Sequence, residues 1–265
     1  MLTDMIEEFR AVLTVGMPPP ASLMSRDVIE QLSKACSIAF EEPIPSETIE
    51  VVAHYYHHVG QRISGRCAGK MEDIVIRLLF RYYACKAVTT ANPDACHLEI
   101  GVLFGAGVIC THKATSLAGR PVPIVAIDPF EGYYGASVDP VSKLEVTEER
   151  FRENLAAFDI PDKDIKLVRG FSTDPAIFEP LRSLNALSIL IDGDHSYEGV
   201  LSDWRNFSPL VMSGGYVLVD DYRNPSWPEI ARCADEQILP SLGSGWATRL
   251  IFGRTLLLQR GPIVD

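Results

Sequence analysis

The pattern of apolar and polar residues changes near residue 90. Before it, apolar side chains recur at helical spacing and predict helices over residues 3–13, 25–40, 46 onward and 71–88, with Ser46 as a plausible N-cap. After residue 95, short apolar runs alternate with amphipathic stretches, as in the strand–helix units of a doubly wound α/β domain. We therefore expect a helical N-terminal extension over 1–90, serving as a cap or an oligomerisation surface, and an α/β domain over 91–265.

The second region contains seven apolar runs short enough to be strands, at residues 97–102, 122–128, 164–170, 186–194, 214–221, 248–253 and 254–260. The last two are nearly contiguous and predict a closing hairpin. Amphipathic helices are expected over 147–158, with Thr147 as cap, over 196–210, with Ser196 as cap, and over 227–242. The expected fold is α/β, with a mostly parallel, seven-stranded, Rossmann-like sheet.

The composition, 47% hydrophobic and 22% charged residues, is that of a globular protein with a full core. A formal net charge of −11 without a Lys/Arg cluster argues against nucleic acid as a partner. No apolar stretch approaches the ~20 residues of a membrane span, and the first ten residues lack the basic-then-apolar order of a signal peptide. We therefore expect a cytoplasmic protein that binds neither nucleic acid nor membrane. The six scattered cysteines are expected to be buried free thiols.

The segment CHLEIGVLFGAG, residues 96–107, passes directly from an apolar run into glycines. Glu99 lies near the end of the run, and Gly101, Gly105 and Gly107 follow. Such a turn presents open backbone and a helix N-terminus at the sheet edge where ligands bind. The GxxxGxG spacing differs from the GxGxxG that receives a pyrophosphate, and an acid beside open backbone suits an amino-acid tail. The alternative is a tight packing turn between a strand and a helix.

Asp128 closes the second apolar run. A carboxylate at that position can accept hydrogen bonds from both hydroxyls of a ribose, although a solvated loop acid is the alternative. Together with the glycine turn, it predicts an adenosine-bearing ligand that needs no phosphates.

Acidic residues also follow the fourth and fifth expected strands. Asp192, Asp194 and His195 lie in IDGDHSYEG, and Asp220 and Asp221 lie in VLVDDY. Because adjacent parallel strands bring their carboxyl ends together, these groups are expected to converge. Converging carboxylates repel unless a cation lies between them or their pKa values rise, and an all-oxygen set suits a hard ion such as Mg²⁺. An uncharged acid cluster and simple helix-cap residues are the alternatives.

The ExGxxxGxG segment, the acid after the second strand, DGDHSYEG and the later DDY and WP resemble a class I S-adenosylmethionine-dependent methyltransferase. More narrowly, they resemble the metal-dependent O-methyltransferases of the macrocin and demethyl-novobiocin type, which modify sugar hydroxyls of natural products. The resemblance covers roughly residues 95–265. It implies S-adenosylmethionine as cofactor and Mg²⁺ held by Asp192, Asp220 and Asp221.

The resemblance also implies which residues meet the cofactor. Glu99 and the Gly101–Gly107 turn would contact its methionine part, Asp128 its ribose, and Ser172 would lie near its adenine. Asp192 is counted among the cofactor contacts as well as among the metal ligands.

The resemblance leaves two candidates for the base that takes the hydroxyl proton. These are His195, three positions after the first metal ligand, and Asp194, two positions after it. We favour His195 because an imidazole titrates near neutrality. A histidine that caps the following helix is the alternative.

The expected reaction is methyl transfer to a hydroxyl of a small molecule, such as a natural-product sugar or another vicinal diol. Mg²⁺ would orient the hydroxyl and lower its pKa. The loop after Asp128, which carries Phe130, Tyr133 and Tyr134, is expected to cover the acceptor, with Trp227 as a further wall. We also expect a homo-oligomer. The alternatives are a catechol- or phenol-type O-methyltransferase, a nicotinamide-dependent oxidoreductase, which the glycine spacing disfavours, and a cofactor-binding protein without catalysis.

Overall fold

The computed structural model describes Glu7 and residues 22–67, 69–87, 95–118, 122–243 and 245–261. The helix expected over 3–13 therefore lies outside the described residues, apart from Glu7. The helices are α2 Arg26–Phe40, α3 Ser46–Arg62, α4 Met71–Ala87, α5 Ala106–Leu117, α6 Glu148–Ala156, α7 Pro175–Phe178, α8 Tyr197–Phe207, α9 Pro228–Cys233 and α10 Leu239–Ser241. The strands are β1 Ala95–Ile100, β2 Ile124–Asp128, β3 Ile165–Arg169, β4 Asn185–Ile191, β5 Val211–Val219, β6 Trp246–Phe252 and β7 Thr255–Arg260.

The strands form one seven-stranded sheet in the order β3-β2-β1-β4-β5-β7-β6. Strands β1 to β5 are parallel to one another. Strand β7 is antiparallel to both of its neighbours, β5 and β6. The predicted mixed, mostly parallel sheet is thus confirmed. The strand order reverses between β1 and β4, which is the point of an open α/β sheet where ligands bind.

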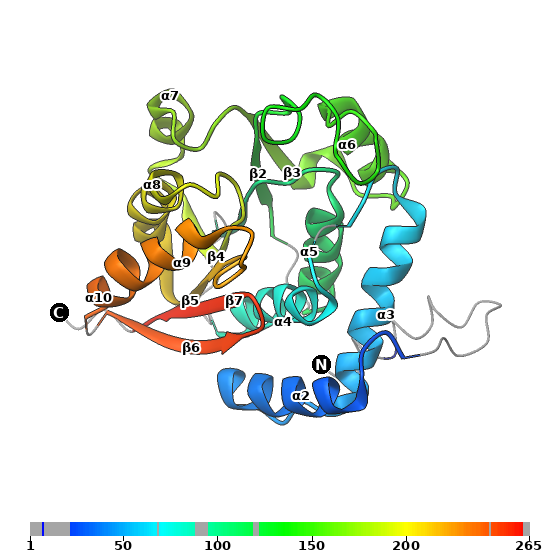
Figure 1. Ribbon diagram of the computed structural model, residues 1–265, viewed down its shortest axis with the longest axis vertical. Coiled ribbons are helices and arrows are strands. Elements are labelled where there is room, and N and C mark those ends of the chain that lie inside the picture. Colours follow the sequence, from blue (N-terminus) through cyan, green and yellow to red (C-terminus); the bar gives the residue numbers. More distant parts are fainter. Residues whose placement is uncertain are drawn as a thin grey trace.

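Apolar side chains at alternating positions of the strands belong to two hydrophobic clusters, one on each face of the sheet. The larger cluster joins α2, α3, α4 and α5 to one face, so the N-terminal helices share a core with the sheet. The other cluster packs α8 and α9 on the opposite face. Figure 1 shows α3, α4 and α5 on one side of the strands and α8, α9 and α10 on the other, with α2 beside the β6–β7 hairpin.

Two of the three predicted N-caps, Thr147 and Ser196, are confirmed. Ser25, Thr147 and Ser196 each accept a hydrogen bond from a backbone N–H of the helix that follows. At the third helix Ser46 is already the first helical residue and Pro45 occupies the cap position, so that prediction was wrong by one residue. The helix expected over 227–242 is interrupted by five π-helical residues, Ala234–Ile238.

The sequence pattern does not predict α7, which is only four residues long. All six cysteines are free, and all but the half-buried Cys67 are buried, as expected. Within the described ranges, no helix combines the length and the apolar character needed to cross a bilayer.

Candidate active site

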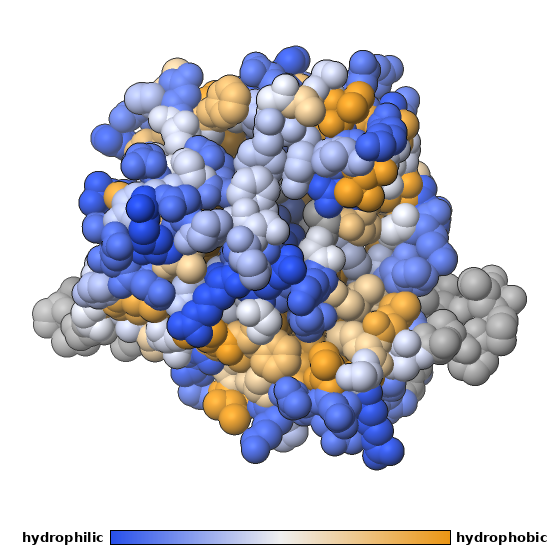
Figure 2. Space-filling model, in the orientation of Figure 1, coloured by the Kyte–Doolittle hydropathy of each residue, from blue (hydrophilic) through white to orange (hydrophobic). Residues whose placement is uncertain are grey.

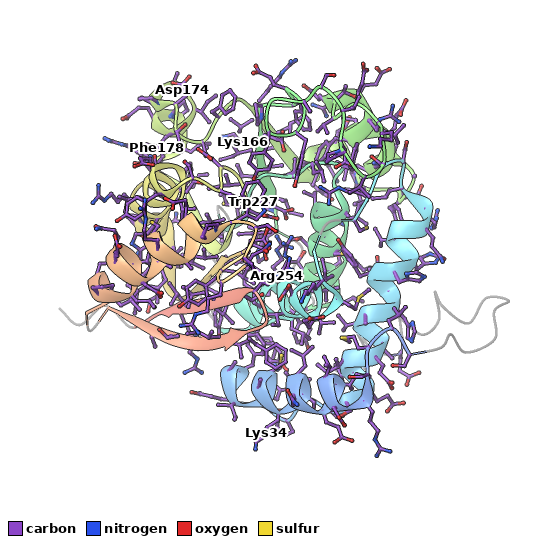
Figure 3. The ribbon with its side chains drawn as sticks, viewed as in Figure 1. Lys34, Lys166, Asp174, Phe178, Trp227 and Arg254 are labelled. Atoms are coloured by element: carbon purple, nitrogen blue, oxygen red, sulfur yellow. The ribbon has the colours of Figure 1, made fainter. Side chains whose placement is uncertain are left out.

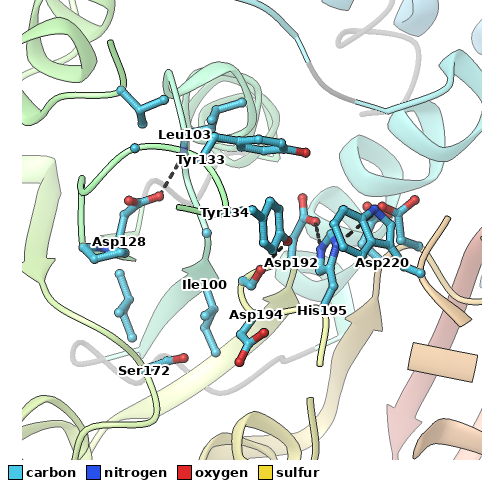
Figure 4. A pocket seen from close by; sticks show the side chains of 18 of the residues that line it. Ile100, Leu103, Asp128, Tyr133, Tyr134, Ser172, Asp192, Asp194, His195 and Asp220 are labelled. Atoms are coloured by element: carbon cyan, nitrogen blue, oxygen red, sulfur yellow. Dashed lines mark hydrogen bonds and ion pairs between the residues drawn. The ribbon is translucent and has the colours of Figure 1, made fainter. Parts of the chain in front are cut away.

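A cavity of about 830 Å³ opens at the carboxyl edge of the sheet, between the loops that follow β1, β2, β3, β4 and β5. Its volume lies within the ~300–1,000 Å³ typical of small-molecule sites. Figure 3 places Trp227 and Arg254, two of its lining residues, near the middle of the molecule in that view, and Figure 2 shows mostly hydrophilic and intermediate surface there. Figure 4 shows two ends, with Asp128 and Ser172 at one and Asp192, His195 and Asp220 at the other.

Strand pairing continues one residue past β4 and β5 and so fixes the two central acids. The backbone N–H of Asp192 donates to the carbonyl of Ile100 (3.0 Å), and that of Asp220 donates to the carbonyl of Ile191 (3.0 Å). Both side chains therefore start from the regular edge of the sheet rather than from free loops. The structure brings together Asp192, Asp220 and Asp221, as their positions after adjacent strands predict.

Asp128 holds two loops of the cavity wall through its carboxylate. One oxygen accepts from the backbone N–H groups of Val102 (2.9 Å) and Leu103 (3.0 Å), and the other from that of Phe130 (2.8 Å). Leu103 and Phe130 have the left-handed backbone that such residues rarely adopt, so these bonds support strained positions. Burial raises the pKa of Asp128, and the three N–H groups oppose that rise. A carboxylate accepts about four hydrogen bonds, which leaves room for one more rather than the two of a bidentate ribose contact.

Ser172 lines the cavity, and its predicted place near an adenine stays a prediction. Next to Ser172 lies a buried acid that the sequence does not single out. Asp203 of α8 is fully buried, and among the described residues neither carboxylate oxygen makes a hydrogen bond of ordinary geometry. Burial raises the pKa of Asp203 to about 7, the Ser172 hydroxyl opposes that rise, and the charge of Asp194 adds to it.

This burial predicts that Asp203 makes stability depend on pH. Because its folded-state pKa is raised, the native protein binds more protons than the unfolded chain between about pH 4 and pH 7, and stability falls as pH rises through that window. We expect Asp203→Asn to be more stable than the wild type at pH 8 by about 1–3 kcal/mol, with little gain at pH 4. Urea unfolding at both pH values measures this, with the exposed Glu198→Gln on the same helix as control. A variant less stable than the wild type at pH 8 would mean that the charged carboxylate is well solvated or paired.

The glycine turn is explained mainly by close packing. A Cβ at Gly101 would overlap the backbone carbonyl oxygen of Asp192, and one at Gly107 would overlap the carboxylate of Glu99. Gly105 has a φ of 87° and lies against Phe151. Of these three glycines only Gly101 lines the cavity. The structure therefore supports the packing alternative for Gly105 and Gly107, and their contact with a cofactor stays a prediction.

Glu99 is not among the residues that line the cavity. Its carboxylate is 3% exposed and forms an ion pair with Arg81 of α4. Burial raises the pKa of Glu99 and lowers that of Arg81, while each charge opposes the shift of the other. In this arrangement Glu99 anchors α4 to the sheet, and its predicted contact with the methionine part of a cofactor is not tested.

The two candidate bases differ in their surroundings. Asp194 is exposed, and its oxygens accept from the backbone N–H and hydroxyl of Ser196 (both 2.9 Å), at the start of α8. His195 is buried, with Nε2 3.3 Å from an oxygen of Asp192, while Nδ1 lies 3.9 Å from an oxygen of Asp221 and makes no hydrogen bond among the described residues. With the proton assigned to Nε2, the free lone pair is on Nδ1. Tyr134 and Trp227 pack on the ring, with centroids 5.4 and 4.8 Å away.

A guanidinium group lies among the acids predicted to hold Mg²⁺. Arg77 of α4 forms a fork with Asp220, through Nε to Oδ1 (3.1 Å) and its terminal nitrogen to Oδ2, and reaches Asp192 (3.0 Å) with its other nitrogen. Within the described ranges, no three His, Cys, Asp or Glu side chains are grouped to hold a metal ion. The residues as arranged therefore do not fit a bound Mg²⁺.

The pKa values of these acids reflect the same arrangement. Burial opposes ionisation of Asp192, but Arg77 and His195 outweigh it and hold its pKa below the usual range. Burial raises the pKa of Asp220, Arg77 opposes that rise, and Asp192 and Asp221 add to it. Arg77 is thus the principal positive charge that stabilises this pair of carboxylates.

Sequence reasoning missed the polar stripe on α4 that supplies this cation. Asp73, Arg77 and Arg81 follow at i, i+4 and i+8, so they share one face of the helix, and all three are buried. Asp73 accepts from the backbone N–H of Arg254 (2.9 Å) and so holds the β6–β7 turn beside the cavity. The available signal was the four-residue spacing of charges in an otherwise apolar helix.

A sheet of order 3-2-1-4-5-7-6 with a ligand-sized cleft at its switch point defines the class I S-adenosylmethionine-dependent methyltransferase fold. A family model described as a methyltransferase domain matches residues 98–222. The structure of the O-methyltransferase NovP superposes with a TM-score of 0.58 over 89% of this chain and 100% of that chain, at 22% identity, which supports the shared fold.

Curated relatives agree with this class. Demethyldecarbamoylnovobiocin O-methyltransferase of Streptomyces niveus is 37% identical over 81 residues, 31% of this chain and 30% of that protein. Rhamnosyl O-methyltransferase of Mycobacterium tuberculosis (strain ATCC 25618 / H37Rv) is 24% identical over 153 residues, 56% of this chain and 50% of that protein. The chain thus spans half or less of these two relatives. The chain is a class I S-adenosylmethionine-dependent methyltransferase related to these O-methyltransferases.

Proposed function

We propose that this protein transfers a methyl group from S-adenosylmethionine to a hydroxyl of a small molecule, with a sugar or similar vicinal diol as the preferred acceptor. The observation that carries the proposal is the two-ended cavity at the switch point, with a buried histidine at one end. The acceptor class is supported by the relatives, one of which is named for a rhamnosyl group and the other for a novobiocin precursor. A catechol- or phenol-type acceptor is the alternative.

The charge of the cavity suits the cofactor. Six carboxylates and three guanidinium groups line it, so a cationic ligand is favoured there. Gly101 lines the cavity, and Asp128 and Ser172 stand at the end proposed for the ribose and adenine. When bound, S-adenosylmethionine would supply a methyl group whose bond to a positively charged sulfur breaks as a bond to the acceptor oxygen forms.

The protein's own contribution is positioning and proton transfer. We assign His195 as the group that takes the acceptor's proton on Nδ1, while Asp192 fixes the ring through Nε2. Tyr134 covers this end, donating its hydroxyl to the carbonyl of Gly193 (3.0 Å), so an acceptor would enter beside or beneath it. The loop that carries Tyr134 fits the predicted cover, and Trp227 fits the predicted wall.

Calorimetric titration of S-adenosylhomocysteine tests the cofactor half of the proposal. We expect one molecule bound per chain, with affinity reduced about two- to tenfold in Ser172→Ala, since one hydroxyl contact would be lost. Ser213→Ala, which removes an exposed hydroxyl on β5, is the matched control. An absence of binding to the wild type would contradict the proposed function.

The acceptor half is tested by incubation with S-adenosylmethionine and either rhamnosides and other vicinal diols or catechols. A mass gain of one methylene on a sugar supports the preferred class, and gain on catechols alone supports the alternative.

The homo-oligomeric state and cytoplasmic location stay predictions, and so does the division into an extension over 1–90 and a domain over 91–265. Light scattering would determine the oligomeric state.

A further inference from the structure

The most unusual feature of the cavity is a buried arginine forked onto two acids of the predicted metal triad. The side chain of Arg77 is 10% exposed, that of Asp220 4% and that of Asp192 17%. Both oxygens of Asp220 and one of Asp192 accept from the same guanidinium. A planar guanidinium that engages a carboxylate in this way is a strong and orientationally specific partner.

A guanidinium that engages Asp192 and Asp220 together occupies the position between them that a divalent ion would need. Mg²⁺ binds carboxylate oxygens at about 2.0–2.1 Å in near-octahedral geometry, and the positive charge of Arg77 would repel an ion placed that close to the same oxygens. The third acid is also engaged, because Asp221 accepts from the side-chain amide of Asn224 (2.7 Å) and lies 3.9 Å from Arg254. All three predicted ligands thus have nitrogen donors or cations of this chain as partners.

The position of Arg77 is supported from its own helix. One turn before it, Asp73 is bonded to the β6–β7 turn, and one turn after it, Arg81 is paired with the buried Glu99. Helix α4 is therefore tied to the sheet on both sides of Arg77. The arginine projects from a fixed, buried face rather than from a surface loop.

We propose that Arg77 takes the place of the divalent metal in this protein, as the resident cation that positions Asp192 and Asp220. The effect of Arg77 on catalysis rests on the proposed methyl transfer, whereas the exclusion of a metal ion by Arg77 does not. Arg77 is a positioning residue: it fixes Asp192, and Asp192 in turn bonds Nε2 of His195. Turnover is accordingly expected to be independent of added Mg²⁺ and insensitive to EDTA.

Binding of Mn²⁺, followed by electron paramagnetic resonance, tests the proposal without any need for turnover. The wild type is expected to bind no stoichiometric Mn²⁺ at millimolar concentration. Arg77→Gln removes the guanidinium and leaves carboxylates converging, so we expect its Mn²⁺ affinity to exceed that of the wild type at least about tenfold. Its melting temperature is expected to rise on addition of Mn²⁺ or Mg²⁺, while that of the wild type does not.

Arg66→Gln is the matched control, because Arg66 also lines the cavity and pairs with an aspartate, Asp139, outside the triad. We expect no gain of Mn²⁺ binding there. One tightly bound Mn²⁺ per wild-type chain would overturn the proposal, and this arm does not depend on any variant folding. Should Arg77→Gln fail to fold, Arg77→Lys keeps a charge without the fork and is expected to give a smaller gain.

A folded Arg77→Gln that binds no more Mn²⁺ than the wild type would also overturn the proposal, since Arg77 would then not be what excludes the ion. Titration of S-adenosylhomocysteine into the same samples separates this result from the proposed function. If S-adenosylhomocysteine and Mn²⁺ both bind the wild type, the proposal that Arg77 replaces the metal is wrong, but the proposed function stands. If neither binds the wild type, the proposed function fails while the exclusion of metal stands.

Discussion

Replacement of His195 by Gln is expected to lower kcat for methyl transfer about 10²–10⁴-fold, the usual loss when a general base is removed. The imidazole is buried beside Asp192, and its Nδ1 makes no hydrogen bond in the described part of the chain and lies 3.9 Å from Asp221, so it is available for a proton. Glutamine fills a similar volume but cannot accept a proton at neutral pH. Affinity for S-adenosylhomocysteine, measured by calorimetry, is expected to change little, since His195 stands at the opposite end of the cavity from Asp128 and Ser172.

Two variants make this result specific. Asp194→Asn is expected to cost less than tenfold in kcat, because the Asp194 carboxylate already serves the start of α8 rather than the cavity centre. His112→Gln replaces a histidine of α5 that pairs with Asp164 away from the cavity, and it should leave kcat unchanged. A large loss in Asp194→Asn together with near-normal turnover in His195→Gln would assign the base to Asp194 instead.

Much of the fold was predictable because it depends on local patterns. Apolar runs of strand length, caps such as Thr147 and Ser196, and acids after strand ends are all visible in short windows of sequence. The convergence of Asp192 and Asp220 followed from one topological rule, that neighbouring parallel strands end at the same edge. These elements of the site could therefore be located before any coordinates.

The partners of those acids could not be predicted in the same way. Arg77 lies 115 residues before Asp192 and 143 before Asp220, and no local pattern links them. The choice between a metal ion and an arginine depends on the packing of α4 against the sheet, which the sequence pattern leaves open. Likewise, the ion pair of Glu99 with Arg81 was not predicted, and the contact of Glu99 with a cofactor stays a prediction.

Replacement of Arg81 by Met is expected to lower the free energy of unfolding by about 3–5 kcal/mol at neutral pH, because it leaves a buried carboxylate without its cation. Arg81 and Glu99 are both almost completely buried, so little solvent would stabilise the remaining charge. Glu99 already has a raised pKa, and loss of Arg81 would raise it further. Above the ordinary pKa of glutamate, the folded variant would then bind more protons than the unfolded variant. The stability that it loses relative to the wild type should therefore shrink as pH falls towards 4.

Urea unfolding at pH 5 and pH 8 measures this effect, and a double variant separates charge from packing. Arg81→Met with Glu99→Gln removes both charges, so it is expected to recover more than half of the lost stability at pH 8. Arg152→Met breaks an exposed pair with Glu148 and should cost no more than about 1 kcal/mol. If the double variant were no more stable than Arg81→Met, the loss would lie in the packing of the arginine stem between α4 and the sheet. The ion pair that ties the first strand to the helix carrying Arg77 would then contribute little by its charge.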